Sequence, residues 1–123
     1  MKLMIVDDSS VIRNKIARGA AAKKFTLVGQ ARDGEEALTL FRESHAEVVT
    51  MDLTMPRMDG IACIQALLAI RPRTLILVVS ALADKATAIE ALKRGAHGFV
   101  LKPFSDEQIG AALLELIRGA VHE

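Results

Sequence analysis

Four apolar runs in this chain are each followed directly by side chains that can do chemistry. Asp7 and Asp8 follow LMIV, Asp52 follows VVTM, Ser80 follows LILVV, and Lys102 follows FVL. These carboxylates, the hydroxyl and the ammonium are the groups that phosphoryl transfer uses, because a carboxylate can attack phosphorus while the other groups stabilise negative charge. We therefore expect a phosphoryl-transfer site if the fold brings the ends of these runs together.

The carboxylates of such a site would repel one another, by about 3 kcal/mol per pair at roughly 5 Å and an effective dielectric constant of about 20. Lys102 supplies one compensating charge, and we expect a divalent cation to supply the rest. Oxygen ligands without His or Cys favour Mg²⁺. Asp52 is the expected nucleophile because it lies in the middle, whereas the adjacent Asp7 and Asp8 can share the metal directly and through water.

The apolar runs are predicted to be strands, because they are rich in β-branched residues and are bounded by polar residues or Gly. Several are apolar throughout, which is typical of parallel strands buried on both faces. The predicted strands are Leu3–Val6, Phe25–Val28, Val48–Met51, Leu75–Val79 and Phe99–Leu101.

The segments between the strands have helical periodicity and begin at residues that cap helices. The fourth helix is expected to face the sheet with Ile89 and Leu92, and the fifth begins with the capping box Ser105-x-x-Gln108. The predicted helices begin near Ser9 or Ser10, Asp33, Asp59, Asp84 and Ser105.

A strand followed by a helix thus occurs five times, and right-handed crossovers then give an α/β fold with an open, doubly wound parallel sheet. The carboxyl ends of parallel strands share one edge of the sheet, where ligands bind in such folds. The carboxylates, the hydroxyl and the ammonium that follow the four apolar runs should therefore meet at this edge. We expect residues 1–123 to form a single domain.

The composition excludes several other classes of function. The net charge of +1 and the 3% content of aromatic residues give no basis for binding nucleic acid or an anionic membrane. Cys63 is the single cysteine, which excludes an internal disulfide and fits a reducing compartment. The apolar run near Met1 is too short for a signal peptide or a membrane span, so we expect a cytoplasmic protein.

Five segments carry a resemblance to a known family: IVDDSS, ARDGEEAL, MDLTMPRMDG, VVSA and GAHGFVLKPF, in this order. From Lys2 to about Arg118 the chain strongly resembles the receiver domain of bacterial two-component response regulators, and most of all the stand-alone chemotaxis regulators. The resemblance implies five parallel strands in the order 2-1-3-4-5 and five helices, a flavodoxin-like arrangement.

The resemblance also implies roles for the site residues. Asp52 would be the phosphoacceptor that takes a phosphoryl group from a histidine kinase. Asp8 and Asp52, with the backbone carbonyl of Thr54, would bind Mg²⁺, and Asp7 would act largely through a metal-bound water.

Two further positions acquire roles in the same way. Ser80 and Lys102 would hold the phosphoryl oxygens, with the ammonium placed by a cis Lys102–Pro103 bond. Phe99 would be the aromatic switch residue that turns inward when the loop at Ser80 moves. Such a domain is a phosphoacceptor that assists its own phosphorylation and dephosphorylation rather than an enzyme.

The signal would leave through a downstream protein, plausibly the flagellar motor switch. The expected surface is the fourth helix, fifth strand and fifth helix, near Lys85, Ala88, Glu90, Phe99 and Lys102. The alternatives are a receiver module of a larger DNA-binding regulator and a phosphate sink. A Mg²⁺-dependent aspartyl-phosphate phosphatase is less favoured, because Thr54 stands where such enzymes carry a second Asp.

Overall fold

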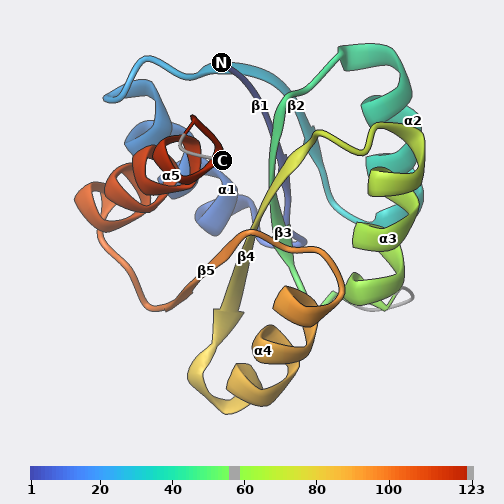
Figure 1. Cartoon of the computed structure of the whole chain (residues 1–123). Helices are drawn as coiled ribbons and strands as arrows, with labels where there is room; N and C mark the ends of the chain where they lie inside the picture. Colours follow the sequence, from blue (N-terminus) through green and yellow to red (C-terminus); the bar gives the residue numbers. More distant parts are fainter. Residues whose placement is uncertain (56–58, 122–123) are drawn as a thin grey trace.

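The computed structural model describes residues 1–55 and 59–121. Residues 56–58, within the MDLTMPRMDG segment, and residues 122–123 lie outside the described part. A parallel sheet forms the middle layer of the described chain, with helices on both of its faces (Figure 1). The α/β arrangement predicted from the alternating pattern is confirmed.

The described residues contain five parallel strands in the spatial order β2-β1-β3-β4-β5, as predicted. The inner strands β1, β3 and β4 are almost entirely buried, whereas β5 lies at an edge and is half-buried along its length. The strands are β1 (Lys2–Val6), β2 (Thr26–Ala31), β3 (Val48–Asp52), β4 (Leu75–Ala81) and β5 (Gly98–Lys102).

The helices of the described part are α1 (Ser10–Ala21), α2 (Gly34–Ser44), α3 (Gly60–Ile70), the short 3-10 helix η1 (Leu82–Asp84), α4 (Lys85–Lys93) and α5 (Asp106–Val121). Side chains of Ser9, Asp33 and Asp59 accept N–H bonds at the starts of α1, α2 and α3. The predicted capping box is present, since Ser105 and Gln108 exchange backbone-to-side-chain hydrogen bonds. None of the described helices is long and apolar enough to span a membrane.

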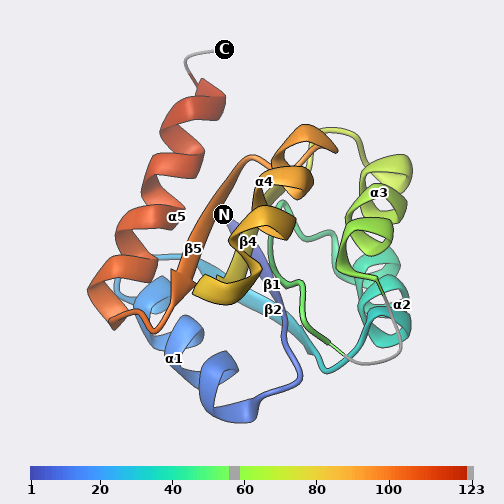
Figure 2. The same cartoon turned by 90° about the horizontal axis from the view of Figure 1, so that it is seen from below.

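The sheet is buried on both faces because α1 and α5 cover one side, and α2, α3 and α4 cover the other (Figure 2). Alternate residues of β1 point to opposite layers: Leu3 and Ile5 join the core under α1 and α5, and Met4 and Val6 join the other core. Side chains of a strand alternate between its faces. A strand between two helix layers is therefore apolar at most of its positions.

The helices α1 and α5 approach each other closely because glycines lie between them. A Cβ atom on Gly19 would lie 2.2 Å from Ile109 Cγ2 and 2.5 Å from the backbone oxygen of Asp106. A Cβ on Gly110 would in turn lie 2.9 Å from the backbone oxygen of Gly19. All three distances require that Gly19 and Gly110 carry no side chain at the crossing of the two helices.

Two details of the predicted elements are wrong. The second strand is Thr26–Ala31 rather than Phe25–Val28, since this edge strand continues past Gly29 and Gln30 and pairs with β1 through a register shift. In α4, Ile89 is 42% exposed and the sheet is met by Ala88 and Ala91. The small alanines let α4 lie near the sheet. Ala88 is therefore buried, although the sequence predicts it on the surface that binds a downstream protein.

Candidate functional site

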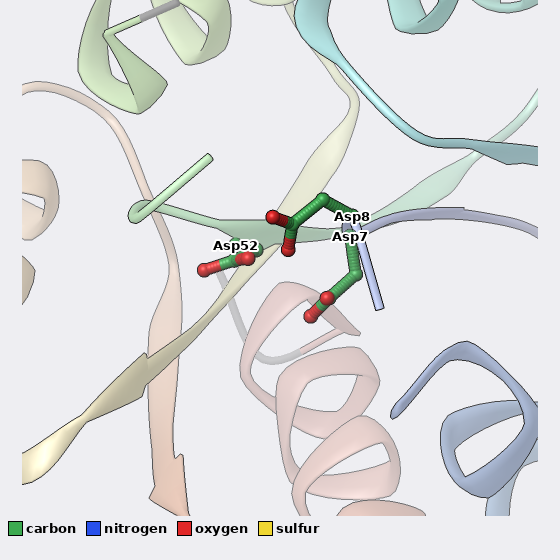
Figure 3. A group of neighbouring side chains, drawn as sticks. All are labelled: Asp7, Asp8 and Asp52. Carbon is green, nitrogen blue, oxygen red and sulfur yellow. The ribbon is translucent and has the colours of Figure 1, made fainter. Parts of the chain in front are cut away.

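Three acidic side chains meet at the carboxyl edge of the sheet, as predicted. Oxygen atoms of Asp7, Asp8 and Asp52 all lie within 4.8 Å of one another (Figure 3). The strands β1 and β3 are neighbours with Val6 opposite Met51, so Asp7 and Asp52, the next residues of each chain segment, lie side by side. The parallel register of two inner strands therefore creates the acidic cluster, which we define as these three residues.

Asp7 is buried, and its two carboxylate oxygens have different surroundings. Its Oδ1 accepts a 2.9 Å hydrogen bond from the backbone N–H of Ser9, and its Oδ2 lies 3.3 Å from Lys102 Nζ. Burial raises the pKa of the Asp7 carboxyl above 3.8, and the charge of Asp52 adds to this, while Ser9 and Lys102 oppose it. The surroundings of Asp7 thus disfavour the charged form of its carboxyl.

Asp52 is the last residue of β3 and is only 1% exposed. Its Oδ1 accepts hydrogen bonds from the backbone N–H of Thr54 at 3.0 Å and from the Thr54 hydroxyl at 2.8 Å. The other oxygen, Oδ2, is buried and has no hydrogen-bond donor among the described residues. One oxygen is therefore fixed by donors, and the second remains available to a ligand.

Lys102 is the cation of the site. Its Nζ lies 3.3 Å from Asp7 Oδ2 and 3.7 Å from Asp52 Oδ1, and its side chain is 22% exposed. It ends β5, and the Lys102–Pro103 peptide bond is cis, as expected from the resemblance. A single ammonium thus bridges two carboxylates that belong to neighbouring inner strands.

Ser80 lies next to the acidic cluster in the sheet but is not hydrogen-bonded to it. It is buried near the end of β4, pairs with Leu101, and its hydroxyl donates a long 3.4 Å hydrogen bond to the carbonyl of Ala81. Because this bond is long, the hydroxyl can be redirected at low cost to a stronger acceptor.

Phe99 and Thr54 complete the predicted set. Phe99 lies on β5 opposite Val78, is partly buried, and packs against the core under α2, α3 and α4 rather than at the acidic cluster. Thr54 is exposed, and its N–H and hydroxyl both face Asp52. The roles of Phe99 as a switch and of the Thr54 carbonyl as a ligand stay predictions.

The acidic cluster has the donor set and the vacant valences that suit a hard divalent cation. Asp52 Oδ2 is buried without a hydrogen bond from the described residues, and such an oxygen is costly unless a cation or water satisfies it. Asp8 is exposed, which leaves one side of the cluster open to water. Oxygen ligands with room for several waters fit Mg²⁺.

Sequence reasoning missed two groups at this edge. Arg13 donates from Nη1 to the carbonyl oxygen of Asp7 at 2.7 Å, and the hydroxyl of Thr54 binds Asp52 directly. Only the spacing of Arg13, six residues after Asp7 on the helix that follows, could have suggested the first contact. No pattern distinguishes a Thr hydroxyl that points inward from one that points to solvent.

The comparisons with known proteins agree with this geometry. The model of the response regulator receiver domain matches residues 3–114 of the chain. The chain is 37% identical over 112 residues to the chemotaxis protein CheY of Thermotoga maritima, covering 91% of this chain and 93% of that protein. It is 36% identical to the regulatory protein AtoC of Escherichia coli, covering 88% of this chain and 23% of AtoC.

A solved structure extends the agreement to three dimensions. The response regulator domain of Thermotoga maritima CheB matches with a TM-score of 0.84 and 33% identity, over 100% of this chain and 97% of that one. The resemblance in sequence is therefore matched by the same arrangement of strands and helices.

Proposed function

This chain belongs to the family of response regulator receiver domains, and on that premise we propose that Asp52 accepts a phosphoryl group from the histidine of a kinase. Receiver domains are phosphoacceptor signalling domains rather than enzymes in the usual sense. The observation that carries the assignment of Asp52 is its buried carboxylate, which lies between Asp7, Asp8 and Lys102 with Oδ2 free of donors.

In the transfer, an oxygen of Asp52 forms the new P–O bond while the P–N bond to the kinase histidine breaks. The bonding electron pair stays on the imidazole nitrogen, which then takes a proton. Lys102 neutralises charge on the phosphoryl oxygens, and the buried hydroxyl of Ser80 turns from Ala81 to donate to one of them. The buried end of β3 holds Asp52 in place, and the end of β5 carries Lys102.

We assign Mg²⁺ binding to Asp8, Asp52 and the backbone carbonyl of Thr54, with Asp7 acting largely through a metal-bound water. Mg²⁺ would supply the positive charge that offsets the acids and the phosphoryl group. The donor-free Oδ2 of Asp52 and the convergence of the three carboxylates support this assignment.

The phosphorylation can be tested by incubating the chain with Mg²⁺ and acetyl phosphate or phosphoramidate, followed by intact-mass measurement. We expect a gain of one phosphoryl group that is lost in Asp52→Ala. Asp84→Asn is the matched control, because Asp84 lies in η1 and its side chain makes no capping hydrogen bond to α4. A phosphoryl group retained in Asp52→Ala, or lost in Asp84→Asn, would contradict the assignment.

For the output, we propose that the surface formed by α4, β5 and α5 binds a downstream protein and changes when Ser80 and Phe99 respond to the phosphoryl group. Ile89 is 42% exposed on this surface. A hollow of about 220 Å³ lies between β5 and α5, lined in part by Gly98, Phe99 and Glu115. An exposed apolar side chain on α4 and a hollow at β5 and α5 both offer surface to a partner protein.

We further propose that residues 1–123 form one cytoplasmic receiver domain that acts in chemotaxis. Support comes from the 93% coverage of the Thermotoga CheY, whereas the partial coverage of AtoC favours the alternative of a module in a larger regulator. The two are separated by measuring the affinity for the flagellar motor switch protein of the same organism, with and without beryllofluoride. Tighter binding with beryllofluoride, reduced in Ile89→Ser, supports chemotaxis; no binding in either state contradicts it.

A further inference from the structure

Arg13 holds the backbone from which the two adjacent acids project. Its Nη1 donates a 2.7 Å hydrogen bond to the carbonyl oxygen of Asp7, and its Nε donates to Gln30 Oε1 at 3.2 Å. The first bond is short, as expected when a guanidinium is the donor. One side chain therefore connects α1, the residue after β1 and the edge strand β2.

The carbonyl of Asp7 needs this donor because the strand ladder has ended. β1 pairs with its neighbours only as far as Val6, opposite Ala31 on β2 and Met51 on β3. The N–H of Asp7 still donates to the Ala31 carbonyl at 3.0 Å. Arg13 then supplies for the Asp7 carbonyl the partner that a continuing strand would have supplied.

The position of Asp8 depends on this anchoring. Its side chain is exposed, and no hydrogen bond or ion pair joins its carboxylate to the described residues. Nevertheless one of its oxygens lies within 4.8 Å of ligand atoms of Asp7 and Asp52. The peptide that joins Asp7 to Asp8 must therefore set the direction of the Asp8 side chain, and Arg13 holds the carbonyl of that peptide.

We propose that Arg13 is a positioning residue for the divalent-cation site: by fixing the Asp7 carbonyl, it keeps the carboxylates of Asp7 and Asp8 at the spacing that binds Mg²⁺. This inference rests on the proposed function of the acidic cluster. Residues that orient metal ligands without touching the metal commonly change metal affinity about 10-fold or more when they are replaced.

Positioning and simple charge effects predict opposite results for the loss of Arg13. A guanidinium bonded to the Asp7 carbonyl repels a cation that enters the acidic cluster, so its removal should tighten Mg²⁺ binding if only through-space electrostatics mattered. If positioning dominates, removal frees the peptide and weakens binding. The sign of the change in affinity therefore separates the two effects.

The experiment measures the Mg²⁺ dissociation constant of the full chain by isothermal titration calorimetry, since the chain has no Trp or Tyr to report binding by fluorescence. We expect Arg13→Met to weaken binding about 10-fold. Arg13→Lys keeps the charge and one donor, and should weaken it less. Arg18→Met is the matched control, because Arg18 lies on the same helix but pairs with the exposed Asp106.

Thermal unfolding with and without Mg²⁺ supplies the second readout. Positioning predicts that Arg13→Met loses most of the rise in Tm that Mg²⁺ gives the wild type. A Tm lowered equally with and without Mg²⁺, together with an unchanged or tighter dissociation constant, would overturn the inference and leave Arg13 a structural residue. The proposed function fails separately if the wild-type chain binds no Mg²⁺. It also fails if Asp52→Ala binds Mg²⁺ as tightly as the wild type does.

Discussion

Lys102→Met tests whether one ammonium holds the acidic cluster together when no divalent cation is present. The change keeps most of the aliphatic stem but removes the charge. At an effective dielectric constant of about 20, the separations of 3.3 Å to Asp7 and 3.7 Å to Asp52 correspond to gross attractions of about 5 and about 4.5 kcal/mol. Desolvation of the ammonium offsets much of this, so we expect a net loss of about 3 kcal/mol in the free energy of unfolding.

The loss in the free energy of unfolding should depend on pH, because a proton on Asp7 removes the charge repulsion between Asp7 and Asp52. Burial and Asp52 raise the pKa of Asp7, and the variant lacks the charge of Lys102 that opposes them. A raised pKa means that the folded state binds the proton more tightly than the unfolded chain. Stability of the variant relative to wild type should therefore recover as the pH falls from about 8 to about 5, and decline as the pH rises.

The assay is urea unfolding followed by far-ultraviolet circular dichroism in buffer that contains a metal chelator. Adding Mg²⁺ instead of the chelator, or adding Asp7→Asn as a second change, should restore part of the lost stability. Lys85→Met, an exposed lysine on α4, is the control and should change stability little. The reasoning is refuted if the loss is the same at both pH values and Asp7→Asn only adds to it.

Three other predictions concern packing, reactivity and the lifetime of the phosphorylated state. Gly19→Ala should destabilise the fold by about 3 kcal/mol, because its Cβ would lie 2.2 Å from Ile109 Cγ2, whereas Gly119→Ala on α5 meets nothing within 4 Å and should not destabilise it; chemical denaturation of both variants checks this. Burial raises the pKa of the Cys63 thiol to about 11, so native protein should resist iodoacetamide at a pH of about 8 until denaturant is added, and rapid native labelling would show the burial to be wrong. If Asp52 is the phosphoacceptor, Leu82→Glu should shorten the lifetime of the phosphorylated chain, because Leu82 is 66% exposed two residues after Ser80 and a carboxylate there can orient water; an unchanged or slower decay of the phosphorylated mass would count against this.

Most of the fold follows from local signals that the structure confirms. The caps at Asp33 and Asp59 and the capping box at Ser105 mark helix starts because their side chains satisfy backbone N–H groups that the helix leaves free. The apolar strands identify the buried middle of the sheet because both faces are covered by helices. Parallel pairing then brings Asp7 beside Asp52 without any further information.

The errors lie where tertiary contacts decide. The strand β2 can include Gln30 because β2 lies at an edge of the sheet and has a neighbouring strand on one side. A prediction that follows only apolar residues therefore ends this strand too early. In α4 the packing distance favours Ala88 over Ile89, which periodicity alone cannot distinguish. The contact of Arg13 with the Asp7 carbonyl is hidden for a similar reason, since it depends on where the ladder of β1 stops.

The order of the strands places the acids of the site on interior strands and its lysine on an edge strand. Asp7 and Asp52 extend from β1 and β3, which have hydrogen-bonded neighbours on both sides, whereas Lys102 ends β5, which has a neighbour only on the side of β4. Displacing a border strand breaks fewer hydrogen bonds than displacing an interior one. When the charge at Asp52 changes, the acids are thus the fixed reference, and the border that bears Lys102 and Phe99 is where the adjustment is cheapest.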